Sequence, residues 1–344
     1  MPKTKTMKQK SRKFLILAMR LFVSIRNQTG FSSNLQFSID AGDAGLDVDT
    51  DLGHAIKIEG GWKWKTKVGM LYEESGKLRF EETKESVTGT KEWAKYNYNI
   101  QKGCSNGCLY CYACAMAVRF KRVEPEGWLT QVEDAKAVLK EWKKKDGTIM
   151  FPTTHDITKS NVGQCVIVLG KMLEAGNNVL VVSKPSPECI GLLCNKLEKY
   201  KSQILFRFTI GSISNEILEL YEPNAPSFQD RLSALAHAHI RGFRTSVSIE
   251  PILDYQPYQV VKIVEDHVTD SIWLGLMNQV KARFKFNGVS EDILKKALEL
   301  TAFWDDMNVK HLYYLVKDNP KVRWKDSIKK IVGIEAPEKV GQDV

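Results

Sequence analysis

The sequence has no apolar run long enough to span a membrane. The apolar stretch at residues 14–25 is broken by Arg20 and falls short of the ~18 to 20 residues that a membrane span requires. No small-residue cleavage site follows it, which argues against a secretory signal peptide. We therefore expect no transmembrane segment. A short helix packed on the body of the protein is our first interpretation of this stretch, and a helix lying on a membrane surface is the second.

Evenly spaced cysteine pairs are also missing. The seven cysteines are an odd number and most of them cluster, so we expect no disulfide framework and a reducing, cytoplasmic location. Structural zinc sites commonly use two short ligand pairs at a distance from each other, and the sequence has neither a second, distant CxxC pair nor an HxxxH motif. Cys165, Cys189 and Cys194 lie in apolar helical patterns and are expected to be core residues.

Acidic residues are missing from the first 39 positions, where eight lysines and arginines occur. The rest of the chain carries 42 bases against 41 acids, so the net charge of +9 lies almost wholly in this N-terminal arm. Such an arm binds phosphate backbones or other anionic surfaces, or it is a disordered tail that keeps the protein soluble. Both interpretations stay open, whereas the balanced charge of the body excludes a globally basic nucleic-acid binder.

What the sequence does contain is a compact cysteine motif. Cys104, Cys108 and Cys111 form the pattern CxxxCxxC, with small, turn-forming residues at 105–107. Three thiolates at this spacing suit three irons of one 4Fe-4S cluster and leave the fourth iron open to a small molecule. Cys114 extends the run. It is either a fourth ligand or, as we favour, a packed thiol that a helix starting near Cys111 turns away from the cluster.

The motif, with Tyr110 directly before its last cysteine, resembles that of the radical S-adenosylmethionine (SAM) superfamily. The resemblance implies a 4Fe-4S cluster and SAM as cofactors, with the open iron binding the amino and carboxylate groups of SAM. One electron from an external reductant such as flavodoxin or ferredoxin then cleaves SAM and releases a 5'-deoxyadenosyl radical. The cofactors supply this chemistry, and the protein positions and shields them.

From residue 98 the sequence alternates β-rich runs with helical patterns, which is typical of parallel β/α units. The predicted strands are residues 98–101, 148–152, 178–183, 204–210, 244–250 and 271–276, and the helices between them include residues 129–145, 164–175, 187–199, 228–241 and 257–266. Six such units predict an α/β fold, with the partial (β/α)6 barrel that the resemblance implies. Active-site residues of such barrels lie at the carboxyl ends of the strands.

The pattern divides the chain into four segments, without an internal repeat: a basic arm at residues 1–39, an N-terminal extension at 40–97, the barrel at 98–286 and a helical C-terminal extension at 287–344. The stretches before about residue 95 predict little regular structure. Residues 62–67 are the exception, as an amphipathic strand or a base-stacking segment. In the last segment we expect a helix at 290–307, a β-like run at 311–316, a closing basic helix, and a disordered tail after Gly333.

A second block of sequence resembles the spore photoproduct lyase-like branch of the superfamily. Its matching residues are Glu222-Pro223, Ala225-Pro226, Arg231-Leu232, Gly242-Phe243, Glu250-Pro251 and the earlier Ser183-Lys184-Pro185. The resemblance covers about residues 98–285 and implies a nucleic-acid substrate. That lyase has a hydrogen-donating cysteine after its second strand, where this chain has Thr-Thr-His-Asp at residues 153–156. We therefore do not expect thymine-dimer repair by that route, and Tyr110 and Tyr112 are the candidate hydrogen-atom relay.

The candidate SAM-binding residues follow the predicted strand ends. The resemblance implies that Tyr110 offers its backbone to the adenine, and Asp156 is a chemically apt acceptor for the SAM ammonium, with helix capping as the alternative. Lys184 is expected to pair with the SAM carboxylate or a substrate phosphate. The complete set at these strand ends is Thr154, Asp156, Ser183, Lys184, Thr209, Ser212 and Glu250, of which Thr209 and Ser212 would bond the ribose and Glu250 would bind SAM or substrate.

Bases alternate with aromatic residues at 281–286 and at 321–325. This pattern suits a nucleic-acid backbone with a stacked or flipped base, although lysines that snorkel over buried aromatics produce it too. The leading hypothesis is a radical SAM enzyme that abstracts hydrogen from a nucleic-acid base in DNA repair or modification. Two alternatives stay open: the same chemistry on a peptide or small metabolite, and a non-catalytic four-Cys iron-sulfur or zinc protein.

Overall fold

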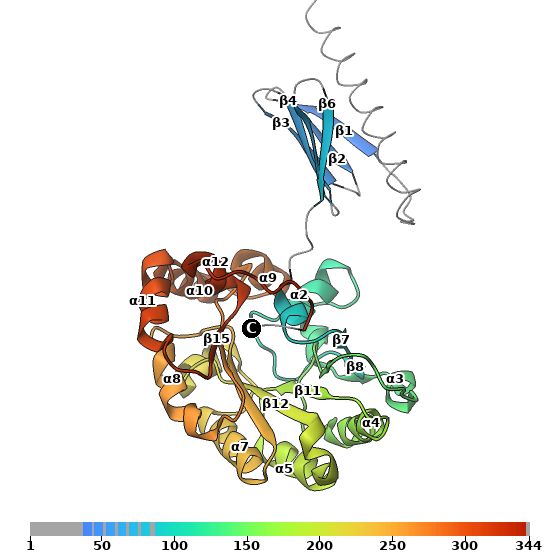
Figure 1. Cartoon of the computed structure of the whole chain (residues 1–344), viewed down its shortest axis with the longest axis vertical. Coiled ribbons are helices and arrows are strands. Elements are labelled where there is room, and N and C mark those ends of the chain that lie inside the picture. Colours follow the sequence, from blue (N-terminus) through green and yellow to red (C-terminus); the bar gives the residue numbers. More distant parts are fainter. Residues whose placement is uncertain are drawn as a thin grey trace, which may run out of the picture. The chain divides into compact units, whose positions relative to one another are not determined.

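A computed structural model of the chain describes residues 87–341 and six strands between residues 37 and 82 (Figure 1). The chain divides into two compact units, Met1–Ser86 and Val87–Val344. The helix predicted at residues 14–25 lies outside the described residues. No helix in the described part of the chain is both long and apolar enough to cross a membrane. The four predicted segments stay a prediction.

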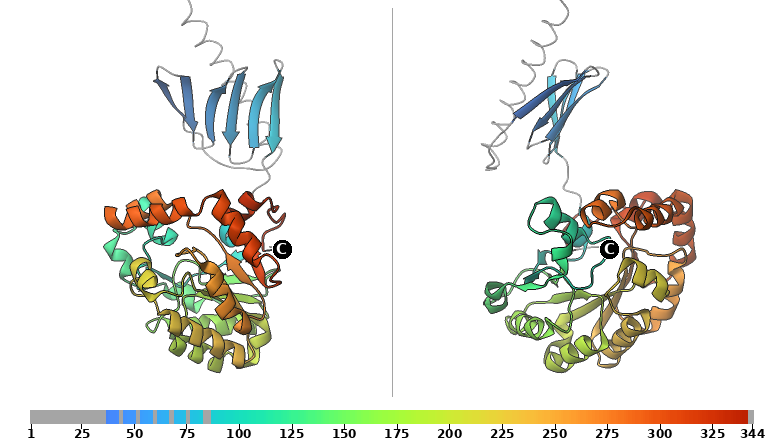
Figure 2. Two further views of the ribbon diagram at one scale, coloured as in Figure 1. Left: turned by 90° about the vertical axis from the view of Figure 1, so that its left-hand side faces the viewer. Right: turned by 180° about the vertical axis from the view of Figure 1, so that it is seen from behind.

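The first unit holds an antiparallel sheet whose strands follow one another in chain order (Figure 2). Its strands are β1 (Phe37–Gly42), β2 (Gly45–Thr50), β3 (Gly53–Ile58), β4 (Gly61–Thr66), β5 (Gly69–Glu74) and β6 (Lys77–Glu82). They begin every eight residues, and four of the six begin with glycine. The expectation of little regular structure and no repeat was wrong here. Apolar residues alternate with charged ones, as at residues 46–49 and 62–65, and glycines recur every eight residues from 45 to 69, which are the signals of short strands and turns. The strand expected at residues 62–67 is confirmed as β4.

The second unit is built on a sheet of seven parallel strands. In spatial order they are β7 (Tyr96–Asn97), β10 (Ile149–Phe151), β11 (Val179–Ser183), β12 (Ile204–Thr209), β13 (Arg244–Ile249), β14 (Ile272–Leu274) and β15 (Val322–Trp324). The spatial order is the chain order, so each strand adds to the same side of the sheet. The predicted α/β fold with an open parallel barrel is confirmed, with β15 as a strand that was not predicted. The strand predicted at residues 98–101 was wrong in its bounds, because the first barrel strand, β7, ends at Asn97. The short strands β8 (Gln101–Lys102) and β9 (Val132–Glu133) pair separately.

Helices connect the parallel strands, and Figure 1 shows several of them along the outer face of the curved sheet. The α-helices are α2 (Tyr112–Arg119), α3 (Ala135–Leu139), α4 (Val162–Glu174), α5 (Pro187–Lys196), α6 (Asn215–Tyr221), α7 (Phe228–Ile240), α8 (Pro257–Val264), α9 (Val280–Phe286), α10 (Glu291–Phe303), α11 (Asp306–Val316) and α12 (Asp326–Val332). The 3-10 helices are η1 (Gly89–Glu92), η2 (Glu126–Leu129), η3 (Glu198–Gln203) and η4 (Glu265–His267).

The strands are buried on both faces, as a parallel sheet requires. Val179 and Val181 of β11 belong to the large core shared with the helices, whereas Leu180 between them packs with Ala94 and Met150 in a second cluster. Alternate residues of a strand point to opposite faces. The segment that follows η1 therefore covers the inner face of the sheet.

Three other expectations were wrong. The run at 311–316 is the end of helix α11, because Val309, Leu312 and Val316 are buried at helical spacing. The helix expected at 129–145 is only the short α3, since its second half is a lysine-rich run with few apolar residues. The tail is ordered up to Gly341, whose backbone N–H donates to the carbonyl of Lys91 at 2.7 Å.

Candidate active site

The cysteine motif lies on a loop between β8 and α2, at the end of the barrel where the parallel strands terminate. Gly103 opens this loop with a φ of +83°, and a Cβ at this position would lie 2.1 Å from the carbonyl oxygen of Thr130. Only glycine fits such a conformation and such a close approach. The sequence between β8 and α2 is therefore built to turn sharply and present its thiols.

The three predicted metal ligands are free thiols. Cys104 Sγ accepts the backbone N–H of Asp156 at 3.4 Å, and Cys111 Sγ, which caps α2, accepts that of Cys114 at 3.4 Å. Burial raises the pKa of all three thiols, and Lys184 opposes this for Cys108. In the described part of the chain, no group of three or more His, Cys, Asp or Glu side chains converges as a site for a single metal ion.

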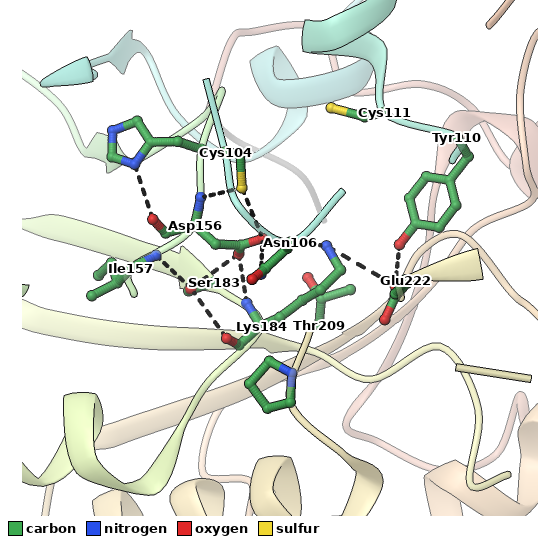
Figure 3. A network of polar contacts seen from close by, with 12 residues as sticks. Cys104, Asn106, Tyr110, Cys111, Asp156, Ile157, Ser183, Lys184, Thr209 and Glu222 are labelled. Atoms are coloured by element: carbon green, nitrogen blue, oxygen red, sulfur yellow. Dashed lines mark hydrogen bonds and ion pairs between the residues drawn. The ribbon is translucent and has the colours of Figure 1, made fainter. Parts of the chain in front are cut away.

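Asp156 is the centre of a buried polar network beside Cys104 (Figure 3). Its Oδ1 accepts the hydroxyl of Ser183 at 3.0 Å and the backbone N–H of Lys184 at 2.7 Å. Its Oδ2 accepts the amide of Asn106 at 2.8 Å and lies 3.6 Å from the ammonium of Lys184. Burial opposes the negative charge of Asp156, but Lys184 and these donors outweigh it and lower the pKa of the carboxyl.

Lys184 connects this network to a second one. Its Nζ lies 4.0 Å from Oε1 of Glu222, the same oxygen that accepts the hydroxyl of Tyr110 (Figure 3). The other oxygen of Glu222 pairs with Arg231, and neither of these two side chains is exposed. Burial disfavours the charge on Lys184, but Asp156 and then its other neighbours raise its pKa well above the ordinary value. The cation of Lys184 is thus held between two carboxylates.

Four hydrogen bonds to distant segments fix the backbone of the cysteine loop. The N–H of Leu109 donates to the carbonyl of Tyr221 at 2.9 Å, and the N–H of Asn224 donates to the carbonyl of Asn106 at 3.3 Å. The side chain of Asn287, just after α9, donates to the carbonyls of Leu109 at 2.8 Å and Cys111 at 3.1 Å. The loop is therefore held from both the α6–α7 connection and the end of α9.

Cys114 lies on the first turn of α2, with its side chain in an apolar cluster. It is 5% exposed and packs with Ala113, Ala117 and Trp128, in the cluster that also contains Cys104. Burial raises the pKa of its thiol to about 12. Cys104 lies in the same cluster and burial raises its pKa in the same way, so the packed-thiol interpretation of Cys114 stays a prediction.

The remaining predicted residues lie around the network. Tyr112 donates its hydroxyl to the carbonyl of Thr153 at 2.6 Å, and the N–H of Thr154 donates to Asn99 at 2.8 Å. Thr209, at the end of β12, accepts Arg231 through its backbone carbonyl at 3.2 Å.

Two predicted residues belong to neighbouring groups. Ser212 is fully buried and donates to Asp254 at 2.5 Å. Glu250 lies 3.8 Å from Lys325, which pairs with Glu92 at 2.7 Å. Burial raises the pKa of Glu250, with Lys325 opposing the shift. The structure thus brings Cys104, Tyr110, Asp156, Ser183 and Lys184 into one connected network, with Ser212 and Glu250 outside it.

Sequence reasoning missed four residues that complete this site: Asn106, Glu222, Arg231 and Asn287. Glu222 and Arg231 belong to the block of sequence that resembles the spore photoproduct lyase-like branch. A glutamate and an arginine nine residues apart, with prolines near both, were the signal that could have predicted their pairing. Nothing in the sequence distinguishes Asn287 from other asparagines, because its role depends on the packing of α9 against α2.

The residues present fit an iron-sulfur cluster. Three unpaired thiols on one short loop are the donor set that such clusters use, and two of them already accept backbone N–H groups, which stabilise a thiolate. The nearly buried ammonium of Lys184, held in place by Asp156, suits the carboxylate of a small ligand beside the cluster.

No protein-family model matches the chain. The uncharacterized protein ORF301 of Acidianus two-tailed virus is 27% identical over 186 residues, and the match spans 49% of this chain and 58% of that protein's length. A solved spore photoproduct lyase mutant with bound AdoMet and dinucleoside spore photoproduct has a TM-score of 0.47 at 14% identity, covering 67% of this chain and 76% of the other. SuiB of Streptococcus suis, bound to its precursor peptide SuiA, has a TM-score of 0.43 at 11% identity, covering 71% of this chain and 53% of the other. Each of the two solved structures matches this chain over about two thirds of its length.

Proposed function

We propose that the chain is a radical SAM enzyme that abstracts hydrogen from a nucleic-acid base. The observation that carries the proposal is the cysteine loop at the carboxyl end of the parallel sheet, clamped from two sides and joined to the buried charges of Asp156 and Lys184. Cys104, Cys108 and Cys111 would hold a 4Fe-4S cluster. When bound, the cluster and SAM would supply a 5'-deoxyadenosyl radical.

The chain's own residues would position the ligand and exclude water. Lys184 offers a positive charge to a carboxylate of SAM, and Asp156 fixes Lys184 by accepting its backbone N–H. Because two oxygens of Asp156 already accept several donors, we assign it mainly to holding Lys184, Ser183 and Asn106 in place. Thr154 follows β10, Thr209 ends β12 and Glu250 follows β13, so all three belong to the carboxyl ends of the strands.

Tyr110 and Tyr112 are suited to relay a hydrogen atom to a product radical. Burial raises the pKa of Tyr110 well above its ordinary value, and that of Tyr112 to about 12. Both phenols therefore keep the O–H hydrogen that a relay requires at neutral pH. Tyr110 donates it to Glu222, and Tyr112 donates it to the carbonyl of Thr153.

Anaerobic reconstitution with iron and sulfide, reduction by dithionite and addition of SAM test the proposal. Chromatography should detect 5'-deoxyadenosine from the unaltered protein and from Cys114→Ala, and none from Cys108→Ala. Cys114→Ala is the matched control because its thiol packs among apolar side chains. Added oligonucleotide should increase the yield of deoxyadenosine.

Two other results would support the alternative functions. If Cys114→Ala loses its iron together with the other cysteine variants, a closed four-Cys site is present and the enzymatic proposal fails. If SAM is cleaved but oligonucleotides leave the yield unchanged, the substrate is a peptide or a small metabolite.

A further inference from the structure

The end of helix α2 carries an exposed cluster of aromatic, apolar and basic side chains. Phe120 is 55% exposed and Met116, one helical turn earlier, is 48% exposed. The guanidinium groups of Arg119 and Arg122 lie 5.7 Å and 5.4 Å from the centre of the Phe120 ring. A large aromatic ring is thus held at the surface with two cations beside it.

Helix α9 packs against α2 and carries two exposed lysines, Lys281 and Lys285. Residues 112–123 and residues 280–287 contain no aspartate or glutamate. The first acidic residue after α2 is Glu124. Within residues 87–341, the structure pairs none of the bases Arg119, Arg122, Lys281 and Lys285 with a carboxylate. The positive charge of the two helices is therefore available to an anionic partner.

We propose that Met116, Arg119, Phe120, Arg122, Lys281 and Lys285, the α2–α9 surface, bind the single-stranded flank of a nucleic-acid substrate. The inference rests on the proposed function. Aromatic rings stack on unpaired bases and basic side chains neutralise the neighbouring phosphates, which is how non-sequence-specific single-strand sites work. A duplex offers its phosphates but no open base face, so an exposed Phe120 and Met116 favour an unpaired strand.

The α2–α9 surface lies close to the cysteine loop. Phe120 follows the last residue of α2, and Cys111 caps the first, so at 1.5 Å per residue the two are separated by about 13 Å along the helix. Asn287 at the end of α9 bonds the carbonyl of Cys111. A nucleic-acid strand bound at Phe120 would therefore place one of its neighbouring nucleotides within reach of the cysteine loop.

Fluorescence anisotropy of a labelled single-stranded oligonucleotide, with the reconstituted full-length protein and a series of salt concentrations, tests the inference. Phe120→Ala should weaken binding about 5- to 150-fold without changing the salt dependence, because stacking is not ionic. The double variant Lys281→Ala/Lys285→Ala should reduce the slope of log K against log salt by about 1.4, which is two single-strand phosphate contacts. A duplex of the same sequence should bind more weakly than the single strand.

Matched controls come from elsewhere on the same unit. Lys196→Ala/Lys199→Ala makes the same change of charge where α5 ends and η3 begins, before β12 and hence at the opposite end of the strands. Tyr314→Ala removes an aromatic ring that is 67% exposed and has Lys317 at 5.9 Å. Both controls should bind the oligonucleotide as the unaltered protein does. Every variant keeps the basic N-terminal arm, so a difference between variants does not come from it.

The inference is overturned if the surface variants bind like the controls, which would assign binding to the N-terminal arm. It is also overturned if the variants lose binding of a labelled acidic peptide and not of the oligonucleotide. Deoxyadenosine yield from the unaltered protein, measured on the same preparation, separates the two proposals. If the unaltered protein cleaves SAM and the surface variants bind the oligonucleotide normally, only the binding surface is refuted. If the variants bind the oligonucleotide more weakly but the unaltered protein does not cleave SAM, the radical SAM function is refuted and the binding surface is supported.

Discussion

Glu222 and Arg231 place opposite charges where neither side chain is exposed to solvent. Arg231 also donates to the carbonyls of Pro226 at 2.8 Å and Thr209 at 3.2 Å, and Glu222 accepts the hydroxyl of Tyr110. The pair thus joins the end of β12, the α6–α7 connection and the cysteine loop. A buried charge that loses its partner is costly, whereas replacing both charges by apolar groups often is not.

Glu222→Gln should therefore lower the free energy of unfolding by about 3–5 kcal/mol, because it leaves the guanidinium of Arg231 buried without its counter-ion. Urea unfolding of the variant and the unaltered protein measures the change. The double variant Glu222→Gln/Arg231→Met removes both charges and should recover part of the loss, since Lys184 still lacks one of its two carboxylates. A single variant that costs no more than an exposed ion pair, below about 1 kcal/mol, would contradict this account.

His155 is a second buried group whose charge state matters. Its Nε2 accepts the N–H of Ile100 at 3.3 Å, so the ring proton is on Nδ1, which lies 3.1 Å from the carbonyl of Asp156. Burial lowers the pKa of His155 below 6.5. Because the folded protein binds this proton less readily than the unfolded chain, His155 stabilises the fold fully above the unfolded pKa of about 6.5, and the contribution decreases as the pH falls below it.

We expect the melting temperature of the unaltered protein to fall more steeply below pH 6.5 than that of His155→Gln, which cannot take up a proton. Differential scanning calorimetry across pH 5 to 7.5 makes the comparison, with about one proton of difference in uptake on unfolding. His311→Gln, at an exposed position on α11, is the control. Parallel curves for His155→Gln and the unaltered protein would refute the assignment.

At the scale of elements, the barrel strands were predictable because each is a short apolar run between polar turns. Residues 178–183 and 204–210 correspond to β11 and β12 within one residue. The sheet of the first unit was missed although its strands alternate apolar with charged residues, as at residues 46–49 and 62–65. Each alternating run covers only a few residues, and the high charge of the segment favoured a prediction of irregular structure. Helix α9 was also missed, since the bases at Lys281, Arg283 and Lys285 look like a loop motif until Phe284 is seen to be buried.

Site residues that lie close together in the sequence or directly after a strand could be predicted. Site residues that only tertiary packing brings to the cysteine loop could not. Cys104, Cys108 and Cys111 are neighbours in one loop, and Asp156 and Lys184 follow predicted strands. Glu222 and Asn287 reach the loop from more than 100 residues away, by Tyr110–Glu222 and Asn287–Leu109 contacts. Ser212 shows the reverse error, because its place after a strand suggested a ligand contact and its hydroxyl is taken by Asp254.

At the scale of the whole molecule, the short segment from Val87 to Ala94 completes the inner face of the barrel. Lys325, which is 1% exposed, pairs with Glu92 at 2.7 Å, donates to the carbonyl of Gly89 at 2.8 Å and lies 4.1 Å from the centre of the Trp93 ring. Ala94 packs with Met150 and Leu180 on the strands. The first residues of the second unit are thus part of its core.

A chain that begins at Val87 should therefore unfold at the same urea concentration as the second unit of the full chain, monitored by tryptophan fluorescence. A chain that begins at Lys95 loses Glu92 and Trp93 and leaves the ammonium of Lys325 without its nearest carboxylate, so it should be less stable by about 3–5 kcal/mol or more. Adding Lys325→Met to the shorter chain should restore part of that loss, since the unpaired charge is removed while the missing apolar contacts are not. Equal stability of the two shortened chains would show that residues 87–94 only cover the barrel. A lower stability of the chain that begins at Val87, relative to the second unit of the full chain, would show that the first unit stabilises the second.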